Sequence, residues 1–425
     1  MVSTSQKLQL AILGGSPAFS EKLHVGRPNI GDREKLLTRF NDVLDRKWFS
    51  NGGKYVNEFE QKLSELTGAK HCIAMCNGTV ALEIMIRALG LTGEVIVPSF
   101  TFVATAHALQ WQEITPVFCD VDPVTHTIDP DAIERLITPK TSGIVGVHVW
   151  GQPCNVEKLE EIAQKHHLKL AFDASHALGC SYNGQMIGNF GEAEVFSFHA
   201  TKFLNAFEGG AIATNNDELA AKIRLMKNFG FGPGYDNVVY VGTNGKMNEM
   251  SAAMGVTGLE SIDDFITANY QNYQQYQAGL ANLPGVRLVT YNETEHNNYQ
   301  YIVVEIDAEK AGISRNEIVQ ILHAENVLAR RYFYPACHRM EPYRSYFPNV
   351  DLLLPETEKL TQRVMALPTG MAVTTDDIQK ICQIIRFVVE NSLAVREFLL
   401  KKSTFIELNT SSNGSKHIAQ DRKCS

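Results

Sequence analysis

Short apolar runs alternate with amphipathic runs between Ala69 and Thr214. The amphipathic runs have the period of helices, and the apolar runs have the length of strands and are rich in Val, Ile, Leu and Phe. Strands that are apolar on both faces are typical of a mostly parallel sheet covered by helices on both sides. We therefore predict an α/β fold whose ligands gather at the carboxyl ends of the strands. The predicted strands lie in HCIAMC, EVIVPSF, TPVFCDVD, GIVGVHVW, LKLAFDASH, EVFSF and GGAIATN.

The same pattern divides the chain into four parts. Residues 1–30 are irregular and predict an N-terminal arm, and residues 31–262 predict a large domain. A long helical run, a break at Pro284-Gly285, two strands and two helices follow, and they predict a smaller C-terminal α/β domain over residues 263–395. Residues 396–425 lose the hydrophobic period and are rich in polar residues, so we expect a flexible tail there.

Composition and charge narrow the class of protein. With 425 residues and 44% hydrophobic content, the chain can bury a large core. It carries 39 basic and 47 acidic residues, a net charge of −8, so we expect neither nucleic acid nor a membrane as a partner. The eight cysteines show no CxxC spacing, which favours a reduced, cytoplasmic protein without a metal site. No apolar run reaches the length of a membrane span, and the apolar segment near the N-terminus is too short for a signal peptide.

One strand end suits a phosphate. The run CIAMC is followed by Asn77, Gly78 and Thr79, where an apolar helix is predicted to begin. Glycine permits close approach of the backbone, and the free N–H groups of a helix start favour an anion. Taken alone, the same residues also fit an ordinary helix cap by Asn77 or Thr79.

A second strand end carries a carboxylate. The run LKLAF ends at Asp173, and a buried carboxylate needs a cation or several hydrogen-bond donors. A protonated pyridine nitrogen would meet that need, and so would a structural ion pair or a helix to cap. His176, three residues further on, taken alone fits a histidine of the core equally well.

A third strand end carries an amine. The run EVFSF contains Ser197 near its end, and Lys202 follows in a short turn with few other charges. A lysine in a partly apolar site becomes neutral more easily, and the neutral amine attacks carbonyl carbons. Taken alone, Lys202 could also be a lysine of a surface loop.

The three strand ends together match one cofactor. Pyridoxal 5′-phosphate (PLP) needs an anchor for its phosphate, a carboxylate for its ring nitrogen and a lysine for its aldehyde. Its ring also needs a flat apolar neighbour, and PSFTFVATAHA places Phe100 and Phe102 after another strand, although either ring could belong to the core.

The chain resembles the DegT-type sugar-nucleotide aminotransferases, which are PLP-dependent enzymes of fold type I, the aspartate aminotransferase-like fold. The resemblance covers about residues 30–395. It lies in NGTVAL, PSFTFVATAHA, VFCDVD, VHVWGQP, FDASHALG, FSFHATK with EGGAIAT, and MNEMSAAMG, in the family's order.

The resemblance implies a role for each candidate residue. Lys202 would be the Schiff-base lysine, Asp173 the partner of the pyridine nitrogen, and His176 a neighbour of the ring hydroxyl. Asn248, in MNEMSAAMG, would reach the phosphate from the other subunit of a homodimer with shared sites. Gly78, Thr79 and Ser197 would bind the phosphate, and Phe102 would stack on the ring.

Within the family, HATKFLNAFEGGA is most similar to enzymes that make dTDP-4-amino-4,6-dideoxyglucose. The resemblance thus implies transfer of an amino group from glutamate to C4 of dTDP-4-keto-6-deoxyglucose, with a C3-aminotransferase or another keto-sugar nucleotide aminotransferase as the alternative. Candidates to bind the diphosphate are Arg27, Lys246, Arg330, Arg331 and Arg339.

Three other classes compete with an aminotransferase. A PLP-dependent sugar dehydratase of the same fold has a histidine in place of the lysine, and Lys202 argues against it. A non-catalytic regulatory homologue is disfavoured because both Lys202 and Asp173 are present. A stand-alone nucleotide-binding domain is disfavoured because the chain has neither G-x-G-x-x-G nor G-x-x-x-x-G-K-[ST].

Overall fold

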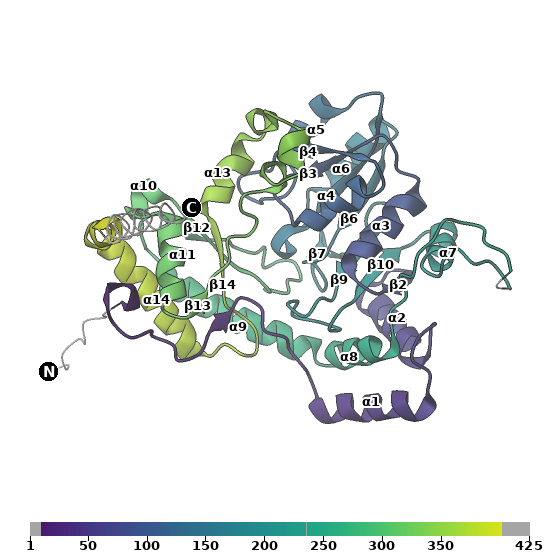
Figure 1. Ribbon diagram of the computed structural model, residues 1–425, viewed down its shortest axis with the longest axis horizontal. Coiled ribbons are helices and arrows are strands. Elements are labelled where there is room, and N and C mark those ends of the chain that lie inside the picture. The colour runs from purple at the N-terminus through teal and green to yellow at the C-terminus, as the bar shows by residue number, and fades with distance from the viewer. Residues whose placement is uncertain (1–9, 235, 402–425) are drawn as a thin grey trace, which may run out of the picture.

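A computed structural model describes residues 10–234 and 236–401. Its centre is a seven-stranded sheet in the order β2-β10-β9-β6-β5-β3-β4 (Figure 1). All neighbouring strands are parallel except β10, which is antiparallel to both β2 and β9. The prediction of a mostly parallel α/β sheet is therefore confirmed. The strands are β2 (His71–Met75), β3 (Glu94–Pro98), β4 (Thr115–Cys119), β5 (Thr141–Val147), β6 (Lys169–Asp173), β9 (Ala193–Ser197) and β10 (Gly210–Thr214).

Helices cover both faces of this sheet because alternate strand residues point to opposite sides and nearly all of them are apolar. In β2, Ile73 faces the core under α3 (Gly78–Leu89), whereas Cys72 faces the core under α2 (Lys54–Thr67). The core under α3 also includes residues of α4 (Val103–Gln110) and α7 (Asp217–Met226). The core under α2 also includes residues of α1 (Arg33–Arg46) and α8 (Glu249–Leu259). The sheet's other half is covered by α5 (Pro130–Ile133) and α6 (Val156–Lys165).

The smaller domain packs helices on a three-stranded antiparallel sheet. The strand order is β11-β12-β14, with β11 (Val286–Leu288), β12 (Ile302–Ile306) and β14 (Val364–Leu367). Helix α9 (Ile262–Leu280) leads into this domain from the large one. Figure 1 shows that it follows α8 and runs toward the small domain. Its Phe265 is buried in the large domain's core, and its Tyr276 in the small domain's core, so one helix belongs to both. The other helices on this core are α11 (Arg315–Ala324) and α14 (Thr375–Glu390).

Two segments cross the predicted domain limits. The arm residues Leu10, Ile12 and Phe19 are buried in the small domain's core, and β1 (Leu23–His24) pairs with β13 (Val327–Leu328). Conversely, residues 337–354 lie within the predicted small domain, yet Cys337, Tyr343 and Leu354 are buried in the large domain's core. These pairings join residues far apart in the sequence, which local pattern does not indicate.

A C-terminal helix and several short elements complete the described chain. The start of the predicted polar tail is helical, because residues 392–401 form a helix and Leu399 is buried in the small domain's core. Residues 402–425 of that tail lie outside the described residues. In the described ranges, none of the helices has both the length and the apolar character needed to cross a bilayer. The remaining elements are β7 (Ser181–Tyr182), β8 (Gln185–Met186), α10 (Ala308–Ala311), α12 (Tyr343–Tyr346), α13 (Pro355–Arg363) and the 3-10 turns Ala11–Leu13, Glu134–Leu136, Val149–Gly151, Cys337–Arg339 and Val350–Leu353.

Candidate active site

The carboxylate of the site stands at the end of the central strand β6. Asp173 is 5% exposed, and its Oδ2 accepts a hydrogen bond from the Thr105 hydroxyl at 2.8 Å. Its Oδ1 accepts from the Ser175 backbone N–H at 3.1 Å. Asp173 is therefore held in place by neutral donors, with no ion pair from the described residues. A buried carboxylate of this kind is suited to a cationic ligand group.

The predicted phosphate anchor is a compact cradle between two strand ends. A Cβ atom added to Gly78 would lie 3.0 Å from Cβ of Ser197, and one added to Gly210 would lie 2.6 Å from the carbonyl oxygen of Asn77. A Cβ at Gly210 would collide with the backbone of Asn77, and one at Gly78 would fit only if the Ser197 side chain shifted by a few tenths of an ångström. The Asn77 side chain caps α3 by accepting from the Val80 N–H at 2.8 Å. Because the other N–H groups of a first turn have no partner within the helix, those near Gly78 and Thr79 suit a phosphate.

Lys202 lies in the loop after β9, the strand that ends at Ser197. Its Nζ donates a hydrogen bond to the Tyr301 hydroxyl at 3.2 Å. Burial lowers the pKa of this half-buried amine from 10.5 to about 8, and the nearby Asp173 carboxylate opposes part of that change. About a tenth of Lys202 is therefore a neutral amine at pH 7, far more than the ordinary pKa of 10.5 would allow, and the neutral form is the one that a nucleophilic or basic lysine requires.

His176 belongs to an aromatic group beside Lys202. Its ring is stacked on Trp150, with centroids 6.0 Å apart, and lies 4.4 Å from the ring of Tyr301. Its Nδ1 accepts from the Trp150 backbone N–H at 3.2 Å. Burial, and then the charge of Lys202, hold the pKa of His176 well below its ordinary value of 6.5. His176 is therefore a neutral ring close to the amine, and its role beside the ring hydroxyl of the cofactor stays a prediction.

The two candidate phenylalanines have different environments. Phe100 is fully buried among His126, Trp150 and Phe333, so its ring belongs to the core. Phe102 precedes α4 and is 58% exposed, which leaves its ring free to contact a ligand. Its carbonyl accepts from the N–H of Thr105, the residue whose hydroxyl binds Asp173.

Asn248 is not part of this cluster within the described chain. It is exposed, and its Oδ1 caps α8 by accepting from the Ser251 N–H at 2.9 Å. The role of Asn248 at a neighbouring subunit's phosphate stays a prediction.

The candidate cations for the diphosphate are dispersed. Arg339 is paired with Glu358 at 2.9 Å, and Arg331 binds Asn316 at 3.2 Å. Arg27 lies 3.9 Å from Glu21, and the amine of Lys246 lies 4.6 Å from the centre of the Phe229 ring. Arg330 acts on the aromatic group, because its charge opposes the rise in pKa that burial causes at Tyr332.

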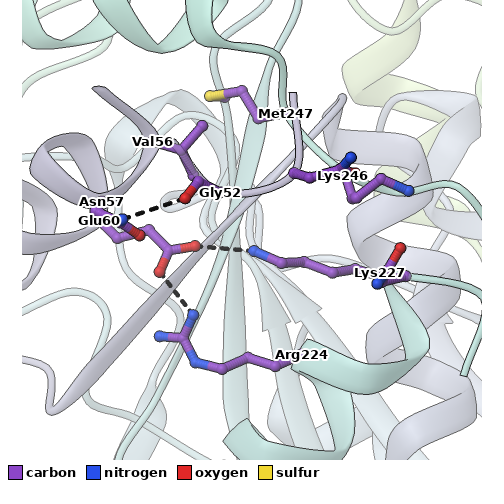
Figure 2. A pocket seen from close by; sticks show the side chains of 10 residues that line it. Gly52, Val56, Asn57, Glu60, Arg224, Lys227, Lys246 and Met247 are labelled. Atoms are coloured by element: carbon purple, nitrogen blue, oxygen red, sulfur yellow. Dashed lines mark hydrogen bonds and ion pairs between the residues drawn. The ribbon is translucent and has the colours of Figure 1, made fainter. Parts of the chain in front are cut away.

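One cavity of the described residues lies away from this cluster. It has a volume of about 230 Å³ and is lined by α2, the end of α7 and the segment before α8. Figure 2 shows Arg224 and Lys227 directed at Glu60, which binds both cations. Of the predicted residues, Lys246, a candidate for the diphosphate, lines this cavity, but none of the residues predicted to bind PLP does, so we assign the chemistry to the cluster around Lys202.

The sequence did not single out two residues of the site. Trp150 is the last residue of the run GIVGVHVW, and its position just after the end of a strand was a usable signal. Tyr301 comes from the small domain, 99 residues after Lys202, and no local pattern indicated the contact.

These side chains fit PLP. The cradle accepts a phosphate and excludes a Cβ, Asp173 suits a protonated ring nitrogen, and Lys202 supplies an amine with a lowered pKa. Fold and site together define a PLP-dependent aminotransferase of fold type I.

The chain belongs to the DegT/DnrJ/EryC1/StrS aminotransferase family, whose model matches residues 31–386. It is 35% identical over 368 residues to dTDP-4-amino-4,6-dideoxy-D-glucose transaminase of Shigella dysenteriae, covering 87% of this chain and 99% of that protein. It is 34% identical over 367 residues to GDP-perosamine synthase of Caulobacter vibrioides, covering 85% and 96%. Among solved structures, DesI in the presence of its TDP-sugar product aligns with a TM-score of 0.87 and 47% identity, covering 91% of this chain and 98% of DesI. The predicted family, cofactor and transaminase activity are thus confirmed.

Proposed function

We propose that this enzyme transfers an amino group from glutamate to C4 of dTDP-4-keto-6-deoxyglucose and gives dTDP-4-amino-4,6-dideoxyglucose. The observation that carries the proposal is the 47% identity to DesI over 98% of that chain, together with the half-buried amine of Lys202 at the centre of the site. The transaminase of Shigella dysenteriae, whose name states this aminated sugar, supports the same substrate.

We assign each site residue a step in this reaction. PLP, when bound, supplies an aldehyde that bonds to the nitrogen of an amine, and a ring that withdraws electrons from the reacting carbon. Asp173 keeps the ring nitrogen protonated, Gly78, Thr79 and Ser197 hold the phosphate, and Phe102 covers the ring. Lys202 would hold the aldehyde through Nζ. Once the amino donor had displaced it, its neutral amine would accept a proton from the substrate carbon at Nζ and deliver that proton to the former aldehyde carbon of the cofactor.

The assembly and the cellular location are part of the same proposal. We infer a homodimer in which Asn248 of each subunit completes the other subunit's phosphate site. Phe49 supports this arrangement, because it is an exposed aromatic residue, 51% exposed, and its carbonyl accepts from the N–H of Glu249, the residue after Asn248. The free cysteines among the described residues favour a reducing cytoplasm.

The substrate is tested with purified enzyme, glutamate and a panel of keto-sugar nucleotides that differ in base and in carbonyl position. We expect a new amine at C4 of the dTDP sugar, located by NMR of the product. Amination at C3, or turnover of a GDP sugar only, would contradict the proposed substrate and leave the transaminase class unchanged. Release of the sugar oxygen without gain of nitrogen would instead indicate the dehydratase.

A further inference from the structure

Tyr301 touches the one amine of the site. Its hydroxyl oxygen lies 3.2 Å from Lys202 Nζ and accepts the hydrogen bond from it. Tyr301 is 6% exposed, and burial raises the pKa of its phenol well above the ordinary value of 10, so the side chain is a neutral phenol throughout the working pH range. The contact is therefore between a neutral oxygen and an amine that changes its charge.

The segment that carries Tyr301 is hydrogen-bonded to the loop of Lys202 and to the loop of His176. The Gln300 side chain donates to the Thr201 carbonyl at 3.2 Å, next to Lys202. The Asn298 side chain donates to the His176 carbonyl at 2.8 Å. The Tyr301 carbonyl accepts from the Tyr291 hydroxyl at 2.7 Å. These bonds fix the phenol relative to the loop of Lys202, although the two residues belong to different domains.

The ring of Tyr301 is also fixed in direction. It lies 4.4 Å from the His176 ring, at an interplanar angle of 45°, and 5.4 Å from the Trp150 ring, at 65°. Trp150 in turn donates from its indole N–H to His126 Nδ1 at 3.2 Å, and His126 Nε2 binds Glu305 Oε1 at 2.9 Å. A ring packed on two sides cannot turn its hydroxyl away from Lys202 without disturbing its neighbours.

We propose that Tyr301 is a further catalytic residue, whose phenol oxygen holds the Lys202 amine and stabilises its ammonium form while the amine carries a proton during transamination. This proposal rests on the assigned role of Lys202. A proton taken from the substrate carbon is added to the Nζ lone pair, and the resulting N–H bonds include one directed at Tyr301. When the proton is returned, the lone pair is restored and the hydrogen bond to the phenol keeps it in position.

The sign of the effect follows from the strength of the two hydrogen bonds. A bond donated by an ammonium is roughly twice as strong as one donated by a neutral amine, so the phenol favours the charged form. Burial acts in the opposite direction on Lys202. Tyr301 therefore raises the pKa of Lys202 above the value that burial alone would give, and the amine remains basic enough to take up a proton.

The test measures the Lys202 amine directly in Tyr301→Phe. In the cofactor-free, full-length protein, the rate of acetylation of Lys202 by acetic anhydride is followed by mass spectrometry over a range of pH. We expect the midpoint of this rate profile to fall by about half a unit to one unit, as the loss of one charge-assisted hydrogen bond predicts. With cofactor, kcat should fall about tenfold with little change in KM for the sugar nucleotide, because the amine acts after binding.

Tyr343→Phe is the matched control. It also removes a buried hydroxyl, one that binds His107 Nδ1 at 2.7 Å in the large domain's core, and it should leave the Lys202 profile unchanged. An unchanged midpoint in Tyr301→Phe, or a shift to higher pH, would overturn the proposal. Borohydride reduction separates this failure from that of the proposed function: if wild-type holoenzyme gains no cofactor mass on Lys202, the assignment of Lys202 itself is wrong.

Discussion

The charge of Lys202 is set by two opposing influences. Burial disfavours the ammonium and lowers the pKa to about 8, whereas the negative charge of Asp173 favours the ammonium. The balance matters because a lysine that must both bond to an aldehyde and move a proton needs a pKa close to the working pH. Asp173 thus has an effect on Lys202 in addition to its proposed contact with the cofactor.

Replacing Asp173 tests this balance. In Asp173→Asn without cofactor, we expect the pKa of Lys202 to fall below about 8, by roughly one unit, because an uncharged amide no longer favours the ammonium. The acylation rate, which rises as the amine loses its proton, should therefore reach its plateau at lower pH than in the wild type. Glu208→Gln removes an exposed carboxylate near the same loop and should not move the curve. A curve displaced to higher pH would refute the assigned influence.

Gly78 allows a test of the cradle. In Gly78→Ala, the new Cβ lies about 3.0 Å from Ser197 Cβ and narrows the space for a phosphate. We expect the Kd for PLP to rise about tenfold, which corresponds to about 1.4 kcal/mol. The stability of the cofactor-free protein should change little, because alanine is the better helix former. Titration of cofactor-free protein with PLP gives the Kd.

Gly258→Ala serves as the comparison for that substitution. Its added Cβ would have no neighbour closer than 3.6 Å, so PLP affinity should be unaltered. Equal affinity in Gly78→Ala and the wild type would remove Gly78 from the phosphate site.

Residues at strand ends were predictable and residues between domains were not. Asp173, Ser197 and Gly78 are brought to one edge because the strands that precede them run in the same direction, a property that the apolar pattern indicates. Period-two alternation did not separate Phe100 from Phe102, and only the burial of Phe100 does so. The contact of Tyr301 with Lys202 needs the packing of the two domains, which no short segment contains.

At the scale of elements, a buried carboxylate joins α2 to α7 and to β2. Glu60 Oε1 accepts from the Ala74 N–H at 2.9 Å and from Lys227 at 2.9 Å, and its Oε2 accepts from Arg224 at 2.7 Å (Figure 2). Burial tends to raise the pKa of Glu60, but the two cations outweigh burial and lower it. The ionised carboxylate is therefore the stable form in the folded protein.

Glu60→Gln should lower the free energy of unfolding by about 3 kcal/mol at neutral pH, because it leaves the charge of Lys227 buried without a counter-charge. The contribution of Glu60 is present above its ordinary pKa of 4.5 and is lost as the pH falls through its lower folded value. The gap between variant and wild type in urea unfolding should thus close in acid. Glu65→Gln, on the exposed side of α2, should show neither effect. A gap that persists in strong acid would contradict the electrostatic cause.

The direction of β10 illustrates what a local pattern leaves open. Its apolar run GGAIATN resembles the other strands, but no helix separates it from β9. A parallel neighbour is usually reached through a helical crossover, and the Lys202 loop that joins β9 to β10 contains no helix, which favours the antiparallel pairing observed. That loop is consequently confined between two paired strands, which positions Lys202.

At the scale of the whole molecule, the two domains are joined by more than one connection. Helix α9 contributes to both cores, the arm residue Leu10 is buried in the small domain, and Tyr343 is buried in the large one. The contact between Tyr301 and Lys202 depends on these connections between the two domains. The sequence indicated two domains, but the exchange of segments between them depends on burial partners that lie hundreds of residues away.

The proposed homodimer makes a prediction about mixed enzymes. If Asn248 acts on the neighbouring subunit's phosphate, each site takes Lys202 from one subunit and Asn248 from the other. Lys202→Ala and Asn248→Ala then remove residues that two different subunits contribute to a site. A heterodimer of the two variants then contains one site with both defects and one site with neither. Random exchange of subunits makes about half of the dimers mixed, so about a quarter of the wild-type activity should appear, although each variant alone is impaired.

Activity is measured after the two variants have been unfolded together in urea, refolded and supplied with PLP. Each variant carried through the same steps alone gives the background, and a mixture prepared without unfolding shows whether subunits exchange unaided. Asn248 caps α8 in its own chain, so thermal unfolding of Asn248→Ala must first show a folded protein. Recovered activity then requires an amine from one chain and an amide from the other, whereas a mixture no more active than its components would place Asn248 in its own subunit's structure alone.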